Sequence, residues 1–306
     1  MPPDKNSPVP RLNRRRAAES AAPAGTTAVI FPFDLFGSAG SGAGAELIAD
    51  ELREILADNR RERTPTRARA YDGRVRLRPC TFETLPDYQD WRPTARRVVR
   101  RVFDRGEFLL WIAGNHLGVL PVYEEVGADT LVVQLDAHLD IHHFSDCTPE
   151  LSHGNFLRHC DRPLPAVVNV GHRELLLLPE DIRAYYRAAH PAEALAADMP
   201  AVLRQLRQTA RRAKRVFLDL DCDVFDPAYF PAVSRPVPFG LSPQQVLAVI
   251  DAVWSGRMVG VAVSEFDPGR DRNDQGLATL MWLIERLLLR RYEPEGQKQG
   301  GERPGG

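Results

Sequence analysis

The chain has 306 residues, of which 43% are hydrophobic and 26% are charged, a composition typical of a soluble globular protein with a large core. Lys and Arg number 40 and Asp and Glu number 41, so the formal net charge is -1. This balance disfavours binding to nucleic acid, which requires a basic surplus. No apolar run reaches the roughly 18 residues of a membrane span, and the N-terminus lacks the apolar core of a secretory signal. We therefore expect a cytoplasmic protein.

The ends of the chain differ in composition from the middle. Residues 1–25 are rich in Pro, Ala and Arg without periodicity, and residues 294–306 are rich in Gly and polar residues, so we predict two disordered tails. No linker or repeat interrupts residues 26–293, which indicates one domain. Four cysteines, none of them in a CxxC pair, indicate reduced thiols and no disulfide framework: Cys80, Cys147, Cys160 and Cys222.

Strand-like and helix-like segments alternate along this domain. Strands are predicted at residues 28–33, 74–79, 108–113, 130–138, 166–170, 216–223 and 258–266. Helices are predicted at residues 45–58, 94–103, 179–189, 201–213, 242–255 and 279–291. Continuous apolar strands are typical of a parallel sheet covered on both faces. The sequence thus predicts an α/β fold with three α/β/α layers and a mostly parallel central sheet.

A glycine-rich segment, GSAGSGAG at residues 37–44, follows the first predicted strand. It lacks the Lys of GxxxxGK[ST] and matches GxGxxG only weakly. We therefore favour a loop that lines a site over the alternative of a nucleotide-binding loop.

Acidic and histidine side chains gather where two predicted strands end. The runs DAHLD (136–140) and DLDCD (219–223) alternate ligand-type residues, and alternate residues of an extended chain share one face. Clustered carboxylates at the end of a buried strand require a cation between them. Together with His116, the two runs supply enough ligands for two divalent metals, and this oxygen-rich set suits Mn²⁺. Cys222 lies on the opposite face, so we expect it in the apolar core.

These motifs resemble the metal signatures of the ureohydrolase superfamily, which includes arginase and agmatinase. The superfamily's D-A-H-x-D is identical to residues 136–140, its G-G-D-H-S resembles AGNHL at 113–117, and its S-x-D-x-D-x-x-D-P resembles residues 219–227. The resemblance implies an arginase-like fold and two Mn²⁺ ions, with Ni²⁺ or another divalent metal as alternatives. It implies six ligands: His116, Asp136, His138, Asp140, Asp221 and Asp223. Asp219 stands where the family usually has Ser.

The resemblance also implies catalytic residues. His153 lies thirteen positions after Asp140, where the family has its proton-shuttle histidine, and Glu265 resembles the glutamate that pairs with the guanidinium of the substrate. Asp223 would orient the attacking water in addition to holding metal. The implied reaction is hydrolysis of a guanidine or amidine C–N bond, with urea and an amine as products of a guanidine. Loop histidines and helix-capping glutamates are the simpler alternatives for His153 and Glu265.

The substrate-binding loops depart from the family pattern. His142 replaces the usual Asn of arginases, and Leu176 replaces the acidic residue that binds the α-amino group of arginine. These changes disfavour free L-arginine as the substrate. Agmatine, a guanidino acid and modified or peptidyl arginine remain possible substrates. The substrate-binding candidates are His142 and Glu265. An amide hydrolase acting on acylated amines and a non-catalytic metal-binding relative are the alternative functions. The family resemblance implies a homo-oligomer, a trimer or hexamer.

Overall fold

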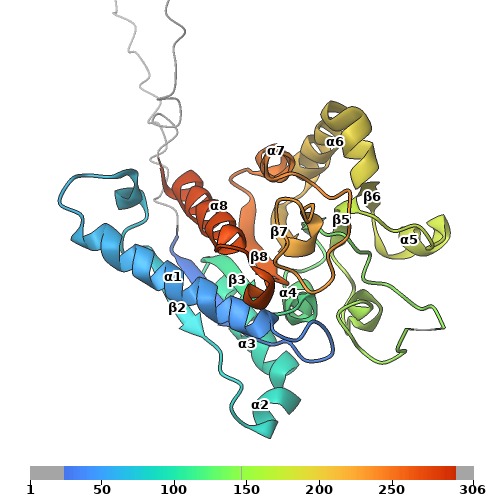
Figure 1. Cartoon of the computed structure of the whole chain (residues 1–306), viewed down its shortest axis with the longest axis horizontal. Helices are drawn as coiled ribbons and strands as arrows, with labels where there is room; N and C mark the ends of the chain where they lie inside the picture. Colours follow the sequence, from blue (N-terminus) through green and yellow to red (C-terminus); the bar gives the residue numbers. More distant parts are fainter. Residues whose placement is uncertain (1–23, 146, 294–306) are drawn as a thin grey trace, which may run out of the picture.

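The computed structural model describes residues 24–145 and 147–293. Within these ranges, eight strands form one sheet in the order β2-β1-β3-β8-β7-β4-β5-β6, and every pairing between named strands is parallel (Figure 1). The three-layer α/β prediction is therefore confirmed. The predicted disordered tails, residues 1–25 and 294–306, lie outside the described residues, except for residues 24 and 25.

The strands are β1 Thr26–Phe31, β2 Val75–Pro79, β3 Phe108–Ala113, β4 Thr130–Leu135, β5 Ala166–His172, β6 Ala188–Pro191, β7 Arg215–Asp221 and β8 Met258–Ser264. The α-helices are α1 Ser41–Arg61, α2 Leu85–Gln89, α3 Trp91–Asp104, α4 Leu120–Glu125, α5 Pro179–Tyr185, α6 Ala192–Arg212, α7 Pro243–Val253 and α8 Gln275–Tyr292. In the described ranges, no helix combines the length and apolar character that crossing a membrane requires.

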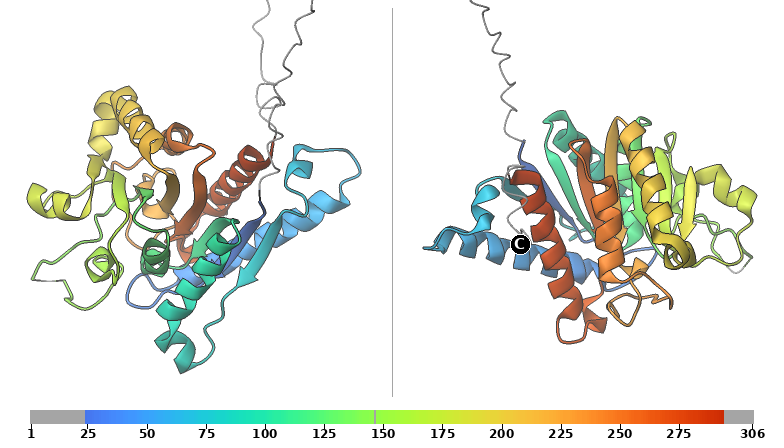
Figure 2. Two further views of the ribbon diagram at one scale, coloured as in Figure 1. Left: turned by 180° about the vertical axis from the view of Figure 1, so that it is seen from behind. Right: turned by 90° about the horizontal axis from the view of Figure 1, so that it is seen from above.

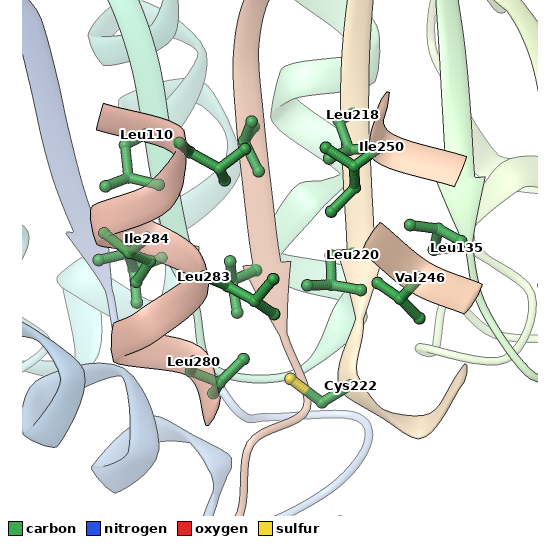
Figure 3. Packing of buried hydrophobic residues seen from close by; sticks show 14 of the residues in the cluster. Leu110, Leu135, Leu218, Leu220, Cys222, Val246, Ile250, Leu280, Leu283 and Ile284 are labelled. Atoms are coloured by element: carbon green, nitrogen blue, oxygen red, sulfur yellow. The ribbon is translucent and has the colours of Figure 1, made fainter. Parts of the chain in front are cut away.

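Two apolar clusters cover the two faces of the sheet. One packs α1, α6, α7 and α8 on the sheet, and the other packs α3 and α4 on the opposite face (Figure 2). Leu218, Leu220 and Cys222 of β7 and the turn after it belong to the first cluster and lie beside α7 and α8 in Figure 3. Cys222 is buried in the core, as expected.

Some predicted elements have different ends. The strand expected at 130–138 ends at Leu135, and the one expected at 216–223 ends at Asp221, so the DAHLD run lies in a turn beyond β4. The helix expected at 179–189 is wrong at its C-terminal end. That helix ends at Tyr185, and Ala188–Pro191 forms the edge strand β6, paired with β5. Pairing with β5 thus outweighs the helix propensity of its alanines.

The glycine-rich segment allows helix α1 to pack closely against the chain that follows β8. Helix α1 begins at Ser41, earlier than predicted, and includes Gly44. A Cβ at Gly44 would lie 2.0 Å from the carbonyl oxygen of Phe266, which follows β8. Glycine therefore allows α1 to lie directly against the chain that leaves β8. This close approach explains why glycine stands at position 44 without invoking a phosphate-binding role.

Candidate metal centre

Four neighbouring strands bring the candidate ligands to one edge of the sheet. Strands β3, β8, β7 and β4 are adjacent and parallel, so their carboxyl ends meet. His116 follows β3, the DAHLD turn follows β4, and Asp221 ends β7. Asp223 lies on the short 3₁₀ turn that comes next. Glu265 immediately follows β8.

The structure brings five of the six predicted ligands together in two groups that share Asp136, and the sixth, Asp221, lies beside His116. His116, Asp136 and Asp140 offer ligand atoms within 4.8 Å of one another, and so do Asp136, His138 and Asp223. The Nδ1 atom of His116 is 2.8 Å from an Asp140 oxygen, 3.1 Å from Asp221 and 3.3 Å from Asp136. Two groups joined by one carboxylate have the arrangement that a binuclear centre requires.

The donor atoms of this cluster fit divalent cations. Three of them are buried and make no hydrogen bond: His116 Nδ1, Asp136 Oδ2 and Asp140 Oδ2. A buried polar atom without a partner is costly, and these three converge on one point. Carboxylate oxygens with a minority of imidazole nitrogens suit Mn²⁺ or a similar ion.

The pKa values of these residues reveal the uncompensated charge. Burial, with the neighbouring Asp140 and Asp223, raises the pKa of Asp136 to about 7. Burial also raises the pKa of Asp221, again with help from nearby carboxylates. Burial opposes the imidazolium of His138, but Asp223 outweighs it and raises the pKa of His138 to about 10. In the absence of metal, these raised pKa values mean that the cluster binds protons in place of cations.

A buried hydrogen-bond chain orients His116. The Nε2 atom of His116 is 2.9 Å from Asp219 Oδ2, and the hydroxyl of Tyr123 donates to the same oxygen at 2.6 Å. With Nε2–H directed at Asp219, Nδ1 keeps its lone pair toward the other carboxylates. Asp219 thus contacts the candidate ligand His116 on the nitrogen opposite the one that faces the carboxylate cluster.

Glu265 and His153 lie together beside the cluster. Oε1 of Glu265 accepts the backbone N–H of His116 at 2.8 Å and lies 3.3 Å from Nδ1 of His153. Glu265 is buried and has φ of 65°, a strained conformation for a residue with a side chain. A Cβ at Gly37 would lie 2.8 Å from the His153 ring, so glycine there leaves room for the histidine.

His142, one of the substrate-binding candidates, lies against the carboxylate of Glu174. Its Nε2 is 2.8 Å from Glu174 Oε2, while Oε1 of Glu174 accepts the backbone N–H groups of Leu175, Leu176 and Leu177. The bond to His142 lowers the pKa of Glu174 to about 2. His142 therefore lines the site while paired with a carboxylate.

A cavity of about 480 Å³ opens over these residues. Its lining includes five of the candidate ligands, Glu265 and His153, together with Phe36 and with Gly37 and Ser38 of the glycine-rich segment. The start of that segment therefore lines the cavity as predicted, while residues 41–44 belong to helix α1 and are not part of the lining. Arg235 also lines the cavity, although no sequence motif pointed to it.

Arg173 is a second residue whose role was not apparent from the sequence. It is the Arg of GHRE after β5, and its guanidinium donates to the carbonyls of Asp223 at 2.6 Å, Val224 at 3.0 Å and Val237 at 3.0 Å. It also donates to the carbonyl of Gly171 at 2.9 Å. Arg173 thereby fixes the backbone of a candidate ligand and the loop that follows β7.

Comparison with known proteins agrees with this arrangement. A family model described as "Arginase family" matches residues 26–289. The chain belongs to the arginase family. Its curated relatives include formimidoylglutamase of Salmonella arizonae, 29% identical over 261 residues, which are 79% of this chain and 78% of the relative. N(1)-aminopropylagmatine ureohydrolase of Thermus thermophilus is 28% identical over 203 residues, 61% of this chain and 65% of the relative.

Solved structures share the fold of this arginase-family chain. Agmatine ureohydrolase of Thermoplasma volcanium has a TM-score of 0.72 at 22% identity, covering 88% of this chain and 90% of that one. Arginase from Bacillus subtilis has a TM-score of 0.70 at 20% identity, covering 86% and 98%. Family membership makes the chain a hydrolase of amidine C–N bonds.

Proposed function

We propose that this protein is a Mn²⁺-dependent amidinohydrolase that cleaves a guanidino compound into urea and an amine. The observation that carries the proposal is the position of Glu265, buried beside the metal-ligand cluster and facing the cavity. Among the described residues, its Oε2 makes no hydrogen bond with the protein. A carboxylate with a free oxygen matches a planar guanidinium by charge and by geometry.

The six ligands would hold two cations, with Asp136 shared between them and Asp221 as a second bridging candidate. When bound, the cations supply Lewis acidity and lower the pKa of a coordinated water. Ni²⁺ or another divalent ion could occupy the same donors.

The chain's own residues would orient the substrate and move the proton. Glu265 holds the guanidinium, and Asp223 accepts a hydrogen bond from the attacking water. His153 is partly exposed, so it can exchange protons with solvent and deliver one to the leaving amine. The guanidine C–N bond breaks, the water oxygen stays on carbon in urea, and the amine leaves neutral.

A formimidoyl compound is a second candidate substrate. The formimidoylglutamase of Salmonella arizonae aligns over 78% of its own length. Hydrolysis of a formimidoyl amine at the same position would give formamide and the amine. Both substrates present a planar amidinium to Glu265, and only the product differs.

Product analysis separates these reactions. The Mn²⁺-loaded protein is incubated with agmatine, 4-guanidinobutanoate, L-arginine, an arginine peptide amide and N-formimidoylglutamate, and urea and formamide are measured. We expect urea from at least one guanidine other than L-arginine. Formamide alone would favour the second candidate, and the absence of both products would refute the amidinohydrolase proposal.

We also propose a cytoplasmic homo-oligomer, a trimer or hexamer, because the residues resemble a family with such assemblies. Light scattering coupled to size-exclusion chromatography of the full chain measures this directly. A monomer at micromolar concentration would contradict it.

A further inference from the structure

We infer that Arg235 selects a substrate whose far end carries a carboxylate, an inference that rests on the proposed amidinohydrolase function. Arg235 lies in the loop after β7 and lines the cavity that contains the metal-ligand cluster. Its guanidinium is the structural feature that the proposed mechanism leaves unused.

The other charges of the cavity have partners. The ligand carboxylates would balance the two divalent cations, and Glu265 would balance the amidinium of the substrate. His153 lies beside Glu265, and His142 lies beside Glu174. Arg235 makes no ion pair or hydrogen bond with any residue that the structure describes. A bound anion would therefore complete the charge balance of the cavity.

The backbone on either side of Arg235 is held in place. The partly buried Arg173 donates to the carbonyl of Val237 at 3.0 Å. At the base of the loop, Asp226 accepts the N–H of Gly240 at 2.9 Å, and Phe225 and Leu241 form an isolated β-bridge. The backbone that carries the exposed Arg235 side chain is therefore held at the cavity, which removes the cost of ordering the loop when a carboxylate binds.

The same surroundings disfavour a cationic tail. An ammonium in place of the carboxylate would meet Arg235 with like charge. Glu174, the acidic side chain next to the cavity residue His142, already accepts from His142 and from three backbone N–H groups. It has little capacity left for an ammonium group. We therefore expect a guanidino acid to be preferred over agmatine, and a formimidoyl amino acid would satisfy the same tail requirement.

The test compares two guanidines that differ mainly in the tail, 4-guanidinobutanoate and agmatine. We expect wild type to prefer the acid. In Arg235→Gln, kcat/KM for the acid should fall about tenfold or more, mainly through KM, because a charge-assisted pairing is lost. Its kcat/KM for agmatine should rise, because the like charge that faces the ammonium group is removed. Arg235→Glu should reverse the preference, which a structural role of the arginine would not do.

Arg207 is an exposed arginine on α6 outside the cavity lining. Arg207→Gln is therefore the matched control, and it should leave kcat/KM for both substrates unchanged. An acid-to-agmatine ratio that stays within threefold of wild type in both Arg235 variants would overturn the inference while leaving the proposed function intact. If wild type turns over no amidine at all, both fail, and that result is distinguishable because it appears without any substitution.

Discussion

At the scale of single residues, Asp219 is expected to support metal binding through His116. In Asp219→Asn the carboxylate that faces His116 Nε2 becomes neutral, so the ring is held less firmly and its basicity falls. We expect metal affinity to drop about 10–100-fold, measured by competition with a chelating dye. Tyr123→Phe removes only the second donor to Asp219 and should cost less than tenfold. Equal affinity in Asp219→Asn and wild type would contradict this role.

Glu265 offers a separate test of substrate binding. Glu265→Gln keeps the volume and an acceptor for the His116 N–H but removes the charge that pairs with an amidinium. We expect kcat/KM to fall at least 100-fold, with metal content unchanged. Unchanged turnover of a guanidine would show that Glu265 does not hold the substrate.

For residues of the centre, the sequence identifies the chemistry better than the geometry. The residue types of the DAHLD and DLDCD runs and of His116 predict a metal cluster, and the structure brings them together. The extended face inferred for residues 136–140 is wrong, because β4 ends at Leu135. The contact between His142 and Glu174 depends on two loops 32 residues apart, which no local pattern reveals.

At the scale of elements, the central strands, the edge strand β2 and the amphipathic helices were predictable, while the edge strand β6 was not. The apolar run 108–113 coincides with β3, because a strand buried on both faces is uniformly apolar. Strand β6 has the half-buried sequence AAHP, which carries no strand signal of its own. Its pairing with β5 is a tertiary effect that the local sequence does not encode.

Gly44 tests the packing of α1 against the end of β8. In Gly44→Ala the new Cβ would meet the Phe266 carbonyl, so α1 or the chain beside Glu265 must move. We expect a loss of about 2–3 kcal/mol of unfolding free energy, measured by urea denaturation.

Gly256→Ala is the matched control, since a Cβ there meets nothing within 4 Å, and its stability should change by less than about 0.5 kcal/mol. Equal stability of the two variants would show that α1 does not need this close approach.

At the scale of the whole molecule, the formal net charge of -1 conceals a concentrated acidic centre. Buried carboxylates of the cluster are uncompensated in the metal-free chain, and the raised pKa of Asp136 reports this. The stability of the fold is thus linked to metal and to pH.

Without metal, stability should fall as pH rises. Folding raises the pKa of Asp136 from 3.8 to about 7. The free energy of unfolding therefore decreases as pH rises from 3.8 to 7, because the unfolded chain releases this proton at a lower pH than the folded chain does. His138, with a folded pKa of about 10, adds stability below pH 6.5 that is lost as pH rises through 10. The affinity for metal rises over the same pH range, because the ligands lose the protons that compete with the metal.

Thermal unfolding of chelated and Mn²⁺-loaded protein between pH 5.5 and 8.5 measures this linkage. The difference in Tm should widen steadily with pH. A constant or narrowing difference would show that these groups do not titrate with metal binding.

The function proposed for this arginase-family chain is hydrolysis of a guanidine at a metal centre built from His116, Asp136, His138, Asp140, Asp221 and Asp223. The most direct test is the rate of urea release from 4-guanidinobutanoate by Mn²⁺-loaded protein, after chelation, and after Mn²⁺ is restored. We expect urea release that is lost on chelation and recovered with Mn²⁺. Urea release that does not change on chelation, or no urea from the loaded protein with any guanidine, would contradict this function.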